Sequence, residues 1–66
     1  MSRYLVEVPV IRRVFALVEA DSKQEALQTA REGQFNEEDV VGTVVDTDDF
    51  GIVVHGVFDN TNRKVN

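Results

Sequence analysis

The chain has 66 residues, one histidine, no cysteine and a formal net charge of −5 at neutral pH. A chain of this length forms one small domain, and its composition excludes disulfides, thiolate metal sites and a histidine-based zinc site. The acidic balance disfavours direct binding of nucleic acid, and the longest apolar run, Val14 to Val18, is far shorter than the roughly 20 residues that cross a bilayer.

The first twenty residues have the alternation of two β-strands. Apolar side chains recur at every second position from Tyr4 to Val10 and again from Val14 to Ala20, which is the period of a half-buried strand. Pro9 has no amide proton to donate to a sheet, so it belongs at an edge or a bend. We expect strands over about 3–9 and 12–20 that form a hairpin. One long bent strand is the alternative, because the turn lacks glycine and asparagine.

The next segment carries the signals of a short helix. Ser22 is followed three residues later by Glu25, which is the pattern of a capping box. Helix-forming residues then continue to Glu32, and Gly33 is suited to the left-handed conformation that ends a helix. Three small or apolar residues at helical spacing predict the buried stripe, namely Ala26, Leu27 and Ala30.

The second half of the chain contains two further candidate strands. Residues 40–45 are rich in β-branched residues, 46–49 are typical of a turn, and 50–58 alternate again. Residues 59–66 are polar and are expected to fray. The sequence therefore predicts one α+β domain over 1–58, in the order β-β-α-β-β. In this domain an antiparallel sheet of three or four strands packs against one helix.

One helix covers only one face of such a sheet, so the other face is a candidate contact surface. With Val14, Ala16, Val18, Ile52, Val54 and Phe58 toward the helix, their neighbours point the other way. The predicted partner-binding residues are Phe15, Leu17, Val53 and Val57, flanked by Arg13, Glu19 and His55. An exposed apolar patch with a polar rim marks an interaction site. The alternatives are that the sheet curls over its own back, or that the two faces are assigned the wrong way round.

The acidic residues are concentrated in the second half of the chain. Eight of the twelve acids and no lysine or arginine lie between Glu32 and Asp59. A predicted acidic surface consists of Glu37, Glu38, Asp39, Asp46, Asp48 and Asp49, with Asp59 as a further contributor. Such a surface either mimics the phosphates of DNA or steers the chain toward a basic partner. The third interpretation is a solvated surface that only confers solubility.

The residues that would support catalysis or metal binding are sparse. A histidine in a strand without a serine and aspartate context, as at His55, favours a structural role, and Ser22 is used as a helix cap. The segment from Asp46 to Gly51 has the spacing of a calcium loop. However, Phe50 and Val57 occupy positions that normally supply ligands, which favours a solvated turn. We therefore expect no enzyme, no metal and no cofactor.

The segment Val18-Glu19-Ala20-Asp21-Ser22-Lys23-Gln24-Glu25-Ala26-Leu27, preceded by an extended stretch and followed by Asp48-Asp49-Phe50, resembles the DpnD/PcfM-like small proteins of phages and mobile elements. The resemblance covers roughly residues 4–50, while Pro9 and the strand after Phe50 depart from it. It implies an accessory protein that binds and modulates a host protein, and it implies no catalytic residues.

These observations favour a non-catalytic protein-binding module. We expect a cytoplasmic location, since the start of the chain lacks the apolar stretch of a secretory signal. The expected partner is a host protein or a second copy of the chain, with no direct nucleic-acid or membrane binding. One alternative is an acidic DNA mimic that inhibits a nucleic-acid-binding protein. Another is a small homo-oligomeric structural protein, because domains of this size often need a partner for stability.

Overall fold

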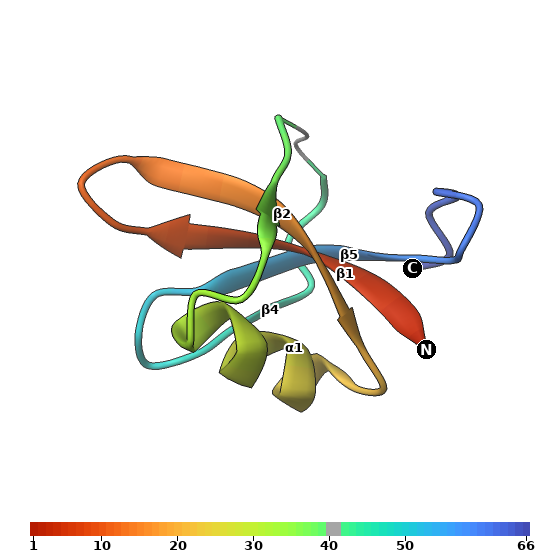
Figure 1. Cartoon of the computed structure of the whole chain (residues 1–66), viewed down its shortest axis with the longest axis horizontal. Coiled ribbons are helices and arrows are strands. Elements are labelled where there is room, and N and C mark those ends of the chain that lie inside the picture. Colours follow the sequence, from red (N-terminus) through yellow and green to blue (C-terminus); the bar gives the residue numbers. More distant parts are fainter. Residues whose placement is uncertain (40–41) are drawn as a thin grey trace.

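The computed structural model describes residues 1–39 and 42–66 (Figure 1). Within these described residues, six elements follow one another: β1 (Ser2–Pro9), β2 (Arg13–Ala20), α1 (Lys23–Arg31), β3 (Asn36–Glu37), β4 (Asp46–Thr47) and β5 (Val53–Phe58). The strands form one antiparallel sheet in the order β3-β2-β1-β5-β4. The predicted α+β class with one helix is confirmed. The sheet has five strands because two short ones, β3 and β4, line its edges.

The first two strands form the predicted hairpin. They pair continuously from Ser2 opposite Ala20 to Pro9 opposite Arg13, so the alternative of one bent strand is wrong. The amide of Val10 donates to the carbonyl of Arg12 across the turn, at 3.2 Å. Pro9 is the last residue of β1, where its missing amide proton costs the sheet least.

The helix begins and ends where its sequence predicts. The hydroxyl of Ser22 accepts from the amide of Glu25 at 3.2 Å. The carboxylate of Glu25 reaches back to the amide of Asp21, at 3.3 Å, rather than to that of Ser22. Gly33 has φ 75°, and its amide bonds to the carbonyl of Ala30, which closes the last turn.

The core lies between α1 and one face of the sheet. Ala26, Leu27 and Ala30 are the buried residues of the helix, and the two alanines let it lie close to the strands. Phe35 and Val45 pack against this core from its margins. The sheet contributes Tyr4, Val6, Val8, Val14, Ala16, Val18, Ala20, Ile52, Val54 and Val57.

Because of a β-bulge in β5, Val57 and Phe58 lie on the opposite faces of the sheet from those predicted. Leu5 pairs with Gly56 and Val6 pairs with Val54, so His55 is an extra residue on β5. The alternation beyond the bulge therefore moves by one position. Val57, predicted for the open face, is 9% exposed and belongs to the core. Phe58, predicted for the core, is half-buried and lines a depression of the other face.

The face opposite α1 (the second face) is partly covered by the chain itself. Because β3 and β4 lie at opposite edges, the chain between them crosses the sheet. In Figure 1, α1 lies below the sheet, whereas residues 38–39, directly after β3, rise above it. Residues 42–45 (the crossing segment) bring the carbonyl of Gly42 to the ring of His55. Leu5, which alternates with core residues on β1, is fully buried on the second face.

The third predicted strand is displaced along the chain. Of residues 40–45, Val40 and Val41 lie outside the described residues, and 42–45 are not in a strand. Asp46 and Thr47, predicted in a turn, pair with β5 instead. The turn follows over residues 48–51, where Gly51 has φ 77°. The displacement follows from the crossing, because the chain first bonds to the edge of β5 at Val45, whose amide donates to the carbonyl of Val54.

The C-terminal tail, which the sequence predicted to fray, lies against β5. The amide of Val65 donates to the carbonyl of Val57 at 2.7 Å, and the amide of Val57 donates to the carbonyl of Asn66 at 3.1 Å. Asp59 fixes the turn between them, since its Oδ1 accepts from Thr61 and from the amide of Arg63. The side chains of residues 60–66 are exposed, so backbone pairing and the Asp59 turn hold the tail.

Candidate functional site

Three of the four predicted partner-binding residues share the second face. Phe15 lies opposite Glu7 on β1, and Glu7 in turn lies opposite Val53 on β5, so one polar side chain separates them. Leu17 lies in the next row, opposite Leu5. All three predicted residues are half-buried, and Val57 lies on the core side. The predicted patch is therefore smaller and less apolar than the alternation indicated.

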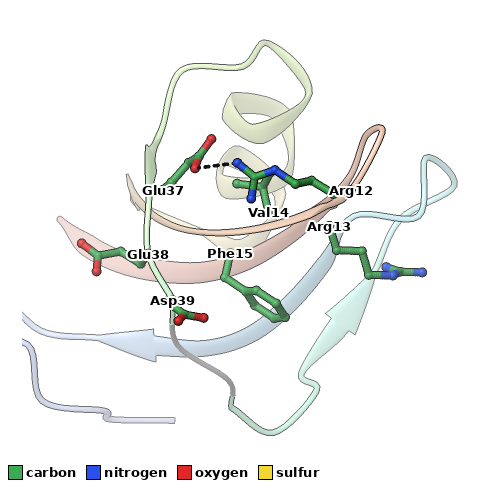
Figure 2. Close-up of a pocket in the computed structure, with 7 residues that line it drawn as sticks. All are labelled: Arg12, Arg13, Val14, Phe15, Glu37, Glu38 and Asp39. Carbon is green, nitrogen blue, oxygen red and sulfur yellow. Dashed lines mark hydrogen bonds and ion pairs between the residues drawn. The ribbon is translucent and has the colours of Figure 1, made fainter.

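A depression beside Phe15 has a mouth of mixed charge. Figure 2 shows it between β2 and the residues around β3, with Arg12 and Glu37 pointing toward each other and Glu38 pointing away. The Arg12–Glu37 pair is 3.4 Å long and its side chains are 74% and 61% exposed, so it adds little stability. The depression is lined by Arg12, Arg13, Val14, Phe15, Glu37, Glu38 and Asp39.

The predicted acidic surface is divided between the two edges of the sheet. Glu37, Glu38 and Asp39 lie at β3, whereas Asp46, Asp48 and Asp49 lie at β4. Both groups adjoin cations, which are Arg12 and Arg13 at one edge and Lys23 and Arg31 at the other. The six residues therefore form two groups, each beside cations, and not one continuous negative surface.

Asp48 has a structural role in the turn before β5. Its side chain is 6% exposed, so it does not belong to an acidic surface. Its Oδ1 accepts from the amides of Phe50 and Ile52, both at 3.0 Å, and its Oδ2 accepts from Nε of Arg31 at 2.9 Å. Both oxygens are engaged, which supports the turn that we favoured over a calcium loop.

A polar cluster joins the buried His55 to both strands of the hairpin, through Glu7 of β1 and the more exposed Arg13 of β2. The imidazole Nε2 lies 2.7 Å from Oε1 of Glu7, and the other carboxylate oxygen pairs with Arg13 at 2.5 Å. The Nδ1 atom lies 3.0 Å from the carbonyl of Gly42. The hydrogen bond with His55, and then that with Arg13, lowers the pKa of Glu7 below its ordinary value of 4.5, against the opposing effect of burial.

The largest exposed apolar side chains of the turns gather at one end of the molecule. Ile11 is fully exposed, and Val10 and Phe50 are 61% and 67% exposed. Val10 and Ile11 form the β1–β2 turn, and Phe50 lies in the β4–β5 turn. The two turns are adjacent, because a Cβ on Gly51 would lie 3.2 Å from Cγ of Pro9. We call Pro9, Val10, Ile11 and Phe50 the apolar end.

The apolar end continues into a depression beside the helix. The guanidinium of Arg31 lies 4.8 Å from the centroid of the Phe50 ring, which orients the ring by a cation–π contact. The depression is lined by Val8, Pro9, Val10, Ala30, Arg31, Phe50 and Ile52. Sequence reasoning missed this end because it searched strand faces. The available signal was Val10-Ile11 at a hairpin turn, where polar residues are usual.

Within residues 1–39 and 42–66, no group of three or more acidic or histidine side chains is arranged to hold a metal ion. In the same residues, no helix has the length and apolar character needed to cross a membrane. Comparison of the chain with protein-family models, with curated proteins and with solved structures finds no match.

Proposed function

We propose that the chain is a non-catalytic protein-binding module that contacts its partner through the apolar end. The observation that carries this proposal is that Val10 and Phe50, from two turns far apart in sequence, line one depression, with Ile11 fully exposed next to Val10 in the chain. When a partner covers water-exposed apolar side chains of this kind, their removal from water stabilises the complex. A few such residues commonly supply most of the energy of an interface.

The shape of the apolar end favours a partner with a concave surface. Ile11 is fully exposed in the turn of a hairpin, and Phe50, in the neighbouring turn, is oriented by Arg31. Arg12, whose side chain is 74% exposed, adds a polar contact at the margin. This arrangement of an apolar centre with a polar rim matches the anatomy of protein interfaces.

The residues with catalytic chemistry already have structural partners, which supports a binding role. Both ring nitrogens of His55 face acceptors, the hydroxyl of Ser22 caps α1, and both oxygens of Asp48 are bonded within the fold. The resemblance to small phage proteins supports the further proposal that the partner is a host protein and that binding modulates it.

The test is capture of partners by the tagged chain from lysate of its native cell, at low and at moderate salt. We expect one dominant protein at both salt concentrations, because apolar contacts are weakly screened. Ile11→Arg should lower its affinity at least tenfold, measured by calorimetry with the purified protein. Val65→Arg is the matched control, since Val65 is also exposed, at 59%, but lies in the tail.

Three results would contradict the proposal. If Ile11→Arg binds as tightly as the wild type while Leu17→Arg does not, the contact lies on the second face. If the partner is a nucleic-acid-binding protein that is lost at moderate salt, the acidic residues carry the binding. If only the chain itself is recovered, it acts as a homo-oligomer.

A further inference from the structure

His55 is held between two groups that only accept hydrogen bonds. Its Nε2 lies 2.7 Å from a carboxylate oxygen of Glu7, and its Nδ1 lies 3.0 Å from the carbonyl oxygen of Gly42. A neutral imidazole carries one N–H, whereas the protonated ring carries two. Only the protonated ring therefore donates to both partners.

The two contacts join separate parts of the fold. Glu7 belongs to β1, whereas Gly42 belongs to the crossing segment that covers the second face. Gly42 approaches so closely that a Cβ at this position would lie 3.2 Å from the carbonyl oxygen of His55. The ring thus fastens the crossing segment to the middle of the sheet.

The charges around the ring decide which bond survives deprotonation. On β1 the facing group is the Glu7 carboxylate, and on β2 it is Arg13, which pairs with the other oxygen of Glu7. On the same strand the ring of Phe15 lies 5.4 Å from the imidazole centroid, and Asp39 lines the neighbouring depression. The crossing segment contributes the neutral carbonyl of Gly42. Hydrogen bonds to a charged acceptor are the stronger ones, so the neutral ring keeps its proton on Nε2 for Glu7.

We propose that His55 is a proton-dependent clasp that holds the crossing segment on the second face. When the ring loses its proton, Nδ1 and the Gly42 carbonyl become two acceptors 3.0 Å apart, and they repel each other. The crossing segment then separates from the sheet beside Phe15 and Val53. Rising pH therefore uncovers these half-buried apolar side chains. The proposal is independent of binding at the apolar end.

The experiment is amide hydrogen exchange of the full chain, measured by NMR on both sides of the pH at which the imidazole nitrogen shifts show that the ring loses its proton. The Val45 amide, which bonds to the carbonyl of Val54 at 2.5 Å, reports on the crossing segment. The Asp48 amide, bonded to Ile52 at 3.0 Å, is the reference in the adjacent turn. As the ring deprotonates, we expect the protection factor of Val45 to fall about fivefold relative to that of Asp48. This fold-change corresponds to the loss of one net hydrogen bond.

In His55→Gln the side chain does not titrate, so the ratio of the two protection factors should stay constant with pH. A second measurement needs no variant: the nitrogen shifts of the wild-type imidazole should place the proton of the neutral ring on Nε2. The proposal is overturned if Val45 protection is unchanged while the ring titrates. It is equally overturned if the neutral ring carries its proton on Nδ1.

Discussion

Val57 lies directly opposite Tyr4 in the pairing of β5 with β1, and both side chains belong to the core. The bulge at His55 places Val57 there, whereas Val53, on the near side of the bulge, remains half-buried on the second face. The two valines of one strand therefore have different energetic roles.

We expect Val57→Ala to lower the free energy of unfolding by about 2 kcal/mol, because it removes buried methyl groups and leaves a cavity. Val53→Ala is the matched control and should cost less than half of this, since its side chain is only partly covered. Urea unfolding at neutral pH measures both. Equal losses would mean that the two residues share one face and that the bulge is absent.

Gly42→Ala should destabilise the chain by about 1 kcal/mol, the lower range for overpacking. The new methyl group would lie 3.2 Å from a backbone oxygen of β5, which has little freedom to move. Thermal unfolding measures the loss, and faster exchange of the Val45 amide would localise it to the crossing segment. A variant as stable as the wild type would show that the segment does not press on the sheet.

Acid should remove the stabilisation that Glu7 provides. The pKa of its carboxyl is lower in the folded chain than its ordinary value of 4.5, so the unfolded chain binds more protons as pH falls. The contribution is fully present above pH 4.5 and is lost as pH falls through the folded pKa. Urea unfolding at several pH values should show a shallower acid loss for Glu7→Gln. Parallel curves for the two proteins would exclude this role.

Asp48→Ala should cost about 2 kcal/mol, because it leaves two amides of the turn and Arg31 without their acceptor. Asp48→Asn retains one carbonyl oxygen for the amides and should cost less. Asp49→Ala is the control at an exposed position. Excess calcium should leave the melting temperature of the wild type unchanged, and a rise would instead identify the turn as a calcium site.

The features that the sequence predicted well are local ones. The hairpin follows from alternation on both sides of Pro9, and the helix follows from Ser22 and Gly33, which act within one turn of their own positions. The bulge was not predictable, because a one-residue shift at His55 depends on how β5 meets β1. An alternating pattern alone assigns Val57 to the wrong face.

The candidate site was less predictable than the fold for a related reason. Phe15 and Leu17 do lie on the second face, but the crossing segment that covers part of it is set by the strand order. The apolar end depends on two turns meeting in space. Neither Val10 nor Phe50 carries a local signal that the other is near.

The edges of the sheet bear on how the chain behaves when it is concentrated. Long exposed edge strands invite pairing between molecules and lead to fibrils. Here the edges are the two-residue strands β3 and β4, which carry Glu37 and Asp46. On β5, the backbone of Val57 is already hydrogen-bonded to the tail. A further molecule that added its strand would meet short, negatively charged edges. The short edge strands and the tail in this way disfavour amyloid-like stacking at the middle of β2 and along β5.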